Sequence, residues 1–246
     1  MTKILGIIPS RYGSQRLRGK ALIDIGGKTM VQRVFEQASK AKKLDKVVVA
    51  TDDERIFTHV KDFGGEAIMT SHNHPTGTDR CAEVALRFQK DYDVCINIQG
   101  DEPFINPDQI DELARLFSDP NTEIGTLVSR IEDYDELFDH KEAKVVFNAK
   151  TFEAMYISRS PIPYYKDKIQ PQWLKLHPYY KNLGIYGFQT KILANISQLP
   201  MSALEIAEGL EQVRWLEHYR IKVGVSKMST LSIDTADDLE KASKYI

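Results

Sequence analysis

Short runs of aliphatic and β-branched residues alternate with helical patterns along the first hundred positions of this chain. The runs at 4–9 (ILGIIP) and 46–51 (KVVVAT) lack polar alternation, which is typical of strands that are buried on both faces of a sheet. Between them, residues 28–43 place Met30 and Val34 on one face of a helix. Buried strands that are separated by helices predict a mostly parallel sheet with helices on both faces.

The pattern changes in the second half of the chain. Further strands are expected at 66–70, 93–100, 221–226 and 231–235. Residues 125–190 are denser in strand patterns, which predicts antiparallel strands and a small subdomain. Four prolines between 161 and 178 mark an irregular segment, typical of a surface loop, a lid or an interface. A helix is expected over 202–219, and another from Ala236. With no linker or repeat in the sequence, we expect one domain over residues 1–246.

Composition narrows the class of protein. The formal net charge is −2 over 246 residues, so the surface as a whole is not built to bind nucleic acid or an anionic membrane. No apolar stretch approaches the roughly 18 residues that cross a bilayer, and the N-terminus shows no secretory cleavage pattern. Cys81 and Cys95 lie in apolar patterns and are expected in the core. We therefore expect a cytoplasmic protein with neither nucleic acid nor membrane as a partner.

A loop dense in positive charge follows the first predicted strand, which stops at Pro9. Its cations are Arg11, Arg16, Arg18 and Lys20. Gly13 and Gly19 let the backbone turn toward a ligand, and Ser14 offers a hydroxyl. Arginine grips phosphate oxygens bidentately, and ligands of open α/β sheets bind beyond the carboxyl ends of the strands. The loop matches neither G-x-x-x-x-G-K-[ST] nor G-x-G-x-x-G, yet it predicts a polyphosphate site.

Carboxylates follow two other strand patterns. Asp101 comes directly after 93–100, and Asp234 lies in the pattern at 231–235. Magnesium takes one or two carboxylates together with substrate oxygens, so a metal between these acids and a phosphate is the functional interpretation. Alternatively, Asp234 or Thr235 caps the helix that follows. Asp52 and Asp53 are interpreted as helix-capping residues after 46–51, with Asp52 near the N-cap, and are left out of the catalytic set.

The segment SHNHPTGTDR (71–80) ends in a small polar turn, Thr76-Gly77-Thr78, ahead of a helical pattern. The start of a helix can contact a base or a phosphate through its free N–H groups. An ordinary capping segment with Thr78 as the cap is the alternative. His72 and His74 could also form a metal pair, although their loop position makes this the weaker interpretation.

Taken in order, the motifs resemble one family over nearly the whole chain. They are IPSRYGSQRLRGKAL, VVVATDDERI, FGGEAIMTSHNHPTGTDR, INIQGDEPFI, KVVF, ISRSPIPY, LGIYGF, LEQVRWLEHYRIKV and IDTADDLE. Together they are similar to the 3-deoxy-manno-octulosonate (Kdo) cytidylyltransferases. The resemblance implies an α/β, Rossmann-like nucleotidyltransferase fold with a mostly parallel central sheet and a smaller strand-rich dimerisation subdomain. It also implies transfer of CMP from CTP to Kdo with Mg²⁺, for lipopolysaccharide synthesis, by a homodimer.

The resemblance also assigns roles to residues, position by position. The implied catalytic residues are Arg11, Arg16, Lys20, Asp101 and Asp234, of which Asp101 and Asp234 bind the metal. The implied nucleotide-binding residues are Pro9, Arg11, Ser14, Arg16, Lys20, Thr76, Gly77, Thr78, Asp79 and Arg80. The implied sugar-acid-binding residues are Gln99, Arg159, Asn182, Tyr186, Glu211 and Gln212. The proline-rich segment at 161–178 falls where the dimer contact is expected.

This sequence departs from the family's pattern at a few positions. Arg18 and Ala21 stand where the family's loop usually has proline, which predicts a more mobile loop. Asn182 replaces a usual histidine, so an amino-substituted Kdo analogue is an alternative substrate. A nucleotide-sugar glycosyltransferase and a non-catalytic nucleotide-binding module are the rival classes. The missing Asp-x-Asp motif after a strand and the dense loop cations weigh against the glycosyltransferase. A phosphate loop combined with two separate metal carboxylates favours catalysis over the binding module.

Overall fold

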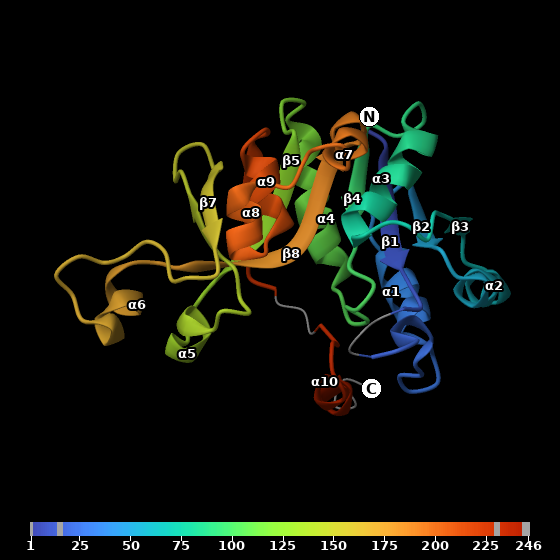
Figure 1. Ribbon diagram of the computed structural model, residues 1–246, viewed down its shortest axis with the longest axis horizontal. Helices are drawn as coiled ribbons and strands as arrows, with labels where there is room; N and C mark the ends of the chain where they lie inside the picture. The colour runs from blue at the N-terminus through green and yellow to red at the C-terminus, as the bar shows by residue number, and fades with distance from the viewer. Residues whose placement is uncertain (1, 14–16, 229–231, 243–246) are drawn as a thin grey trace.

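A computed structural model describes residues 2–13, 17–228 and 232–242 of the chain (Figure 1). Within these residues one sheet of nine strands is formed, in the order β3-β2-β1-β4-β8-β5-β9, with β6 and β7 branching from β8. The strands are β1 (Ile4–Ser10), β2 (Lys46–Thr51), β3 (Ala67–Met69), β4 (Val94–Asn97), β5 (Ile124–Arg130), β6 (Lys144–Phe147), β7 (Ala154–Ser158), β8 (Tyr180–Gln189) and β9 (Ile221–Ser226).

Ten α-helices lie in the described ranges. They are α1 (Met30–Ala38), α2 (Glu54–Asp62), α3 (Gly77–Phe88), α4 (Pro107–Arg115), α5 (Tyr134–Phe138), α6 (Trp173–Leu176), α7 (Thr190–Ile196), α8 (Ala203–Glu208), α9 (Glu211–Leu216) and α10 (Ala236–Ala242). Short 3-10 turns, η1 (Lys20–Leu22), η2 (Leu116–Ser118) and η3 (Gln170–Gln172), complete the order. None of the helices described here is long and apolar enough to cross a membrane.

The predicted parallel sheet is confirmed in the first half of the chain, where β1 pairs in parallel with both β2 and β4, and β2 with β3. Successive residues of β1 point to opposite faces of the sheet. Ile4 and Ile8 therefore join a core with Val34 of α1, while Leu5 and Ile7 join a second core with Val84 of α3. Helices on both faces explain why this strand carries no alternating polar residues.

Antiparallel strands, expected within 125–190, enter the sheet through β8. This strand runs antiparallel to β4 on one side and to β5 on the other, and β6 forms an antiparallel pair with β7. The segment that holds α6 extends away from the sheet, on the left of Figure 1. The element order therefore combines a parallel first half with a second half that is richer in strands, as the sequence predicts.

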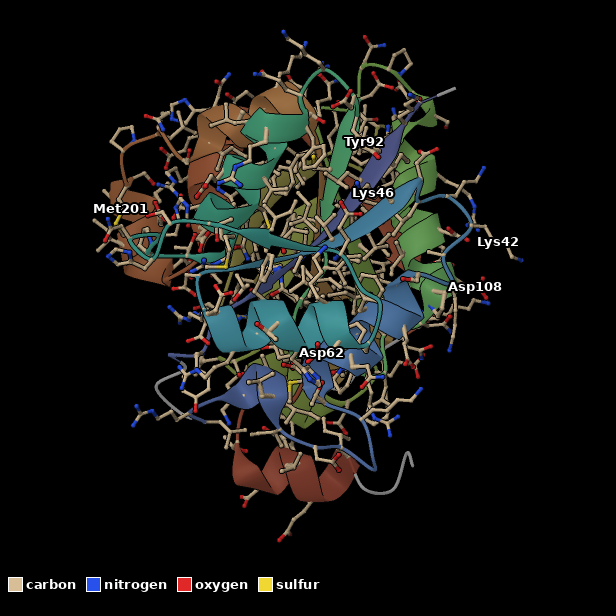
Figure 2. All side chains as sticks on the ribbon, turned by 90° about the vertical axis from the view of Figure 1, so that its right-hand side faces the viewer. Lys42, Lys46, Asp62, Tyr92, Asp108 and Met201 are labelled. Carbon is tan, nitrogen blue, oxygen red and sulfur yellow. The ribbon has the colours of Figure 1, made fainter. Side chains whose placement is uncertain are left out.

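Two predicted elements are wrong. The helix expected over 202–219 is two short helices, α8 and α9, because Gly209 adopts a left-handed conformation (φ 61°) that ends α8. The strand expected at 231–235 is not formed over 232–235, and Leu231 lies outside the described residues. Instead, Ile233 packs against Ile25 and Met30. This packing holds the C-terminal segment with α10 beneath α1, at the bottom of Figure 2.

Candidate active site

A cavity of about 230 Å³ opens beyond the carboxyl ends of β1 and β4, where the topology of an α/β sheet places a ligand. The predicted site residues that line it are Pro9, Arg11, Lys20, Thr76, Gly77, Arg80, Gln99, Asp101 and Asp234. Gly100 closes its floor by lying against β1: a Cβ on this residue would stand 2.6 Å from the Pro9 carbonyl oxygen. Only glycine permits so close an approach of two backbones.

Lys20 stands between the two predicted metal ligands. Its Nζ donates hydrogen bonds to Asp101 Oδ2 and to Asp234 Oδ1, each at 2.8 Å. The preceding Gly19 has φ 70°, and its N–H donates to the Tyr12 carbonyl at 3.0 Å, which turns the loop back and presents Lys20 on η1. Three segments far apart in the sequence thus meet at one ammonium group.

Asp234 reaches the cavity because the neighbouring residue, Ile233, is hydrogen-bonded to the backbone of Asp101. The Ile233 N–H donates to the Asp101 carbonyl at 2.9 Å. Thr235, not Asp234, caps α10: its Oγ accepts from the Asp238 N–H at 3.3 Å, and Asp238 Oδ2 accepts from the Thr235 N–H at 3.0 Å. The capping alternative for Asp234 is therefore wrong, and its carboxylate faces Lys20.

The turn before α3 also reaches the cavity. Thr76 is the N-cap of the helix, since its hydroxyl accepts from the Asp79 N–H at 3.1 Å, so the alternative with Thr78 as the cap is wrong. Arg80 is buried at the cavity wall, where it pairs with Asp52 at 3.3 Å. Asp52 is accordingly not a helix cap.

Asp53 is the residue that caps α2. Of the two histidines considered as a metal pair, His74 lines the cavity, and its Nε2 lies 2.6 Å from Glu83 Oε2. His74 is therefore fixed by an acid. The pattern that could have marked it as a lining residue is its position two residues before the helix cap Thr76.

Three of the residues implied to bind the sugar acid, Gln99, Asn182 and Tyr186, belong to a hydrogen-bond network along β8. Gln99 Nε2 donates to the Gly184 carbonyl at 3.0 Å. Asn182 Oδ1 accepts from the Gly184 N–H at 3.0 Å and from the Tyr186 hydroxyl at 2.9 Å, and its Nδ2 donates to Thr126 Oγ1 at 2.9 Å. Asn182 thus positions Tyr186 and the backbone next to Gln99.

Glu211 and Gln212 begin α9 on the other side of this network. Oε2 of Glu211 is buried, and burial raises the pKa of its carboxyl above the ordinary value, while the neighbouring Thr78 hydroxyl counteracts part of the rise. Burial also raises the pKa of the Tyr186 hydroxyl. Thr78, a predicted nucleotide-binding residue, therefore contacts Glu211, a predicted sugar-acid-binding residue.

Arg159 does not line the cavity. Its guanidinium group donates hydrogen bonds to several backbone carbonyls. Nε donates to Glu208 O at 2.7 Å, Nη2 to Gly209 O at 3.1 Å and Nη1 to His140 O at 2.9 Å. In this arrangement Arg159 fixes the backbone that leads into α9. Its implied contact with the sugar carboxylate stays a prediction.

Two predicted site residues are not described by the structure, and the cavity lining includes a residue that was not predicted from the sequence. Ser14 and Arg16, both expected to bind phosphate, lie outside the described residues. Ser10 also lines the cavity, and its buried Oγ has no hydrogen-bond partner among the described residues. Its position as the last residue of β1 is the signal that could have identified it.

The donor set suits a hard divalent cation. Two carboxylate oxygens converge on one position that already holds the cationic Nζ of Lys20, and magnesium binds proteins through one or two carboxylates plus phosphate oxygens. Among the described residues, no group of three or more His, Cys, Asp or Glu could hold a metal ion. The chemistry of Asp101 and Asp234 fits Mg²⁺ with further oxygens from another molecule, and this metal stays a prediction.

Comparison with known proteins defines the class. A family model described as "Cytidylyltransferase" matches residues 5–223, so the chain is a cytidylyltransferase. The chain is 51% identical over 251 residues to the 3-deoxy-manno-octulosonate cytidylyltransferase of Parabacteroides distasonis, covering 100% of this chain and 99% of the relative. It is 49% identical to that of Bacteroides thetaiotaomicron, covering 99% and 98%.

A solved structure agrees with these relatives. The structure of CMP:2-keto-3-deoxy-manno-octonic acid synthetase complexed with CTP superimposes with a TM-score of 0.91 at 40% identity, covering 99% of this chain and 98% of that one. The chain belongs to the 3-deoxy-manno-octulosonate cytidylyltransferase family, and the predicted α/β fold and family resemblance are confirmed.

Proposed function

We propose that this protein transfers CMP from CTP to Kdo, giving CMP-Kdo and pyrophosphate for lipopolysaccharide synthesis. The observation that carries the proposal is the meeting of Lys20, Asp101 and Asp234 at the mouth of the cavity beyond β1 and β4. This arrangement provides both a cation for the phosphates and carboxylates for a metal. The family to which the chain belongs supports the choice of CTP and Kdo.

In the proposed reaction, the C2 hydroxyl of the sugar acid attacks the α-phosphorus of CTP. An oxygen–phosphorus bond forms there, the bond from the α-phosphorus to the bridging oxygen of pyrophosphate breaks, and the hydroxyl proton leaves to solvent. Arg11 and Lys20 neutralise charge on the departing pyrophosphate, and Gln99 orients the sugar. Mg²⁺ held by Asp101 and Asp234 supplies Lewis-acid stabilisation of phosphate charge when it is bound.

The protein groups around the base and the sugar are proposed to act mainly by position. Thr76 and Gly77 at the N-terminus of α3 line the cavity, next to the buried Arg80, and a helix N-terminus can bind an anion through its backbone N–H groups. Tyr186, fixed by Asn182, and Glu211 are not among the described lining residues, and they are proposed to contact the sugar acid. Because the Asn182 side chain bonds to four protein groups, it shapes this region through Tyr186, and Kdo stays the proposed sugar acid.

The cellular setting is part of the proposal. Both cysteines are buried and free, which suits a reducing compartment, and we propose a cytoplasmic enzyme. We also propose a homodimer that is formed through the extended segment around α6, where Tyr164 and Ile169 expose large apolar side chains.

A pyrophosphate-release assay tests the function. The purified protein is incubated with CTP, Mg²⁺ and one of three acceptors: Kdo, an 8-amino Kdo analogue or a neutral hexose. Release with Kdo and not with the hexose is expected. Release only with the 8-amino analogue would change the assigned sugar acid, and no release with either sugar acid would contradict the proposal.

A further inference from the structure

The Lys20 ammonium occupies the point on which both metal-binding carboxylates converge. Its distances to Asp101 Oδ2 and Asp234 Oδ1 are equal, 2.8 Å each, and its side chain is only 12% exposed. The two aspartates are 28% and 33% exposed, so the lysine is the most enclosed member of the group. This geometry is that of a cation held between two anions and not of a lysine that extends into an open phosphate site.

Electrostatics explains the arrangement. Two carboxylates that a fold brings together repel each other, and an ammonium between them offsets this repulsion with charge-assisted hydrogen bonds. A divalent cation binds the same oxygens, so Mg²⁺ and the ammonium compete for one position. A triphosphate carries several negative charges and gives Lys20 another strongly anionic partner within the same cavity.

We propose that Lys20 is the internal counter-ion of the metal site in the nucleotide-free enzyme, and that the CTP phosphates draw it away when the metal binds. The inference rests on the proposed function in one respect, the assignment of the metal to Asp101 and Asp234. Lys20 then has two successive partners: the carboxylates in the free enzyme and the phosphates in the complex.

This exchange has a thermodynamic consequence. While Lys20 stays between the carboxylates, a divalent ion alone binds weakly, because it must displace a charge that is already bonded. Nucleotide removes that competitor, so metal and nucleotide favour each other's binding, and the coupling is reciprocal. Removing the ammonium should therefore strengthen metal binding in the absence of nucleotide and weaken nucleotide binding in the absence of metal.

The experiment measures Mn²⁺ binding to the full-length protein without nucleotide, by electron paramagnetic resonance of the free ion. It compares wild type with Lys20→Met and Lys20→Gln. The control is Lys28→Met, since Lys28 is an exposed lysine bonded to Glu36 outside the cavity. CTP binding is measured separately by calorimetry in EDTA. Circular dichroism melting selects whichever Lys20 variant folds like wild type, and glutamine keeps a hydrogen-bond donor near the carboxylates if methionine does not fold.

The expected result is Mn²⁺ affinity at least about 5-fold higher in the Lys20 variant than in wild type, with CTP affinity lowered by a similar factor. Lys28→Met should change neither. Mn²⁺ affinity that is unchanged or lower in a folded Lys20 variant would overturn the inference, because a lysine that serves only the phosphates, or only the fold, gives that result. A wild-type protein that forms no CMP-Kdo would overturn the proposed function alone, since Mn²⁺ binding uses neither substrate.

Discussion

Lys20, Asp101 and Asp234 reach the site for different local reasons. Asp101 follows a buried strand, a relation that can be read directly from the sequence. Lys20 depends on the left-handed Gly19, and Asp234 on a backbone hydrogen bond from Ile233 to the Asp101 loop. The sequence thus predicted which residues to consider, while the contact that joins them comes from long-range packing that local patterns do not encode.

Replacement of Asp101 by asparagine should separate catalysis from stability. The change removes one negative charge from the metal site, so we expect the turnover number to fall by about 100-fold or more. The free energy of unfolding should change by less than about 1 kcal/mol, because the ion pair is partly exposed. Steady-state pyrophosphate release over a range of Mg²⁺ concentrations measures the first effect, and urea denaturation the second.

Asp108→Asn is the matched control for this substitution. Asp108 lies on α4 at the edge of the molecule in Figure 2, and it is exposed and outside the cavity. Its replacement should leave turnover unchanged. Wild-type turnover of Asp101→Asn at saturating Mg²⁺ would remove Asp101 from the metal site.

Glu211 makes a prediction about pH. Burial raises the pKa of its carboxyl in the folded protein above 4.5, its ordinary value. Between 4.5 and the raised pKa the unfolded chain is ionised while the folded protein still holds the proton, so the free energy of unfolding decreases as pH rises. Glu211→Gln removes this dependence. Its melting temperature relative to wild type should therefore be higher at pH 8 than at pH 4.5.

Thermal denaturation at the two pH values measures this difference. Glu132→Gln, at an exposed position, is the control and should show the same difference from wild type at both pH values. If the difference between Glu211→Gln and wild type were independent of pH, the carboxyl would not be perturbed by burial.

At the level of elements, local sequence patterns were sufficient to predict the strands in the parallel half of the sheet. They were insufficient to predict the strand pairing in the rest of the sheet. Residues 4–9 and 46–51 are apolar throughout because helices cover both faces, and that requirement is visible in the sequence. The insertion of β8 between β4 and β5 is a choice among strand pairings that have similar local patterns, and only tertiary packing decides it. The network of Asn182 with Thr126 and Tyr186 follows from that pairing and could not be predicted before it.

The break between α8 and α9 shows how one residue overrides a helical pattern. Residues 202–219 have apolar spacing that is compatible with a single helix, yet Gly209 at φ 61° and ψ 39° ends α8, and its N–H donates to Glu205 O at 2.7 Å. This turn starts α9 at Glu211 and leaves the Gly209 carbonyl to accept from Arg159. The glycine thus sets the direction of the element that carries two predicted sugar-acid residues.

Gly209→Ala should destabilise the protein by about 1–2 kcal/mol, the cost of a left-handed conformation for a residue with a Cβ. Space is not the cause, since the added Cβ would lie 3.9 Å from Arg159 Nε, an ordinary contact. Gly209→Asn should recover part of this loss, because asparagine tolerates the conformation better. Urea denaturation of both variants measures the effect, and equal loss in both would show that strain at φ is not responsible.

At the scale of the whole molecule, the segment around α6 is the part that the sheet does not explain. It extends from the body in Figure 1, and the side chains of Tyr164 and Ile169 within it are 73% and 67% exposed. Apolar side chains gathered on a projecting segment are typical of a surface that another chain covers. In the proposed homodimer the mass by light scattering should be about twice the 28.1 kDa of one chain.

Ile169→Asp should shift this equilibrium toward the monomer, because an unpaired carboxylate would be buried at the interface. Ile206→Asp is the matched control: Ile206 has nearly the same exposed fraction, 65%, but lies on α8, next to the sheet and apart from the α6 segment. Light scattering at several protein concentrations should therefore show dissociation for Ile169→Asp and a wild-type mass for Ile206→Asp.

Dissociation by Ile206→Asp alone would place the interface on α8, and a monomeric wild type would contradict the proposed homodimer. The described residues that line the cavity do not belong to the α6 segment, so the monomeric variant should still bind CTP, which separates assembly from nucleotide binding.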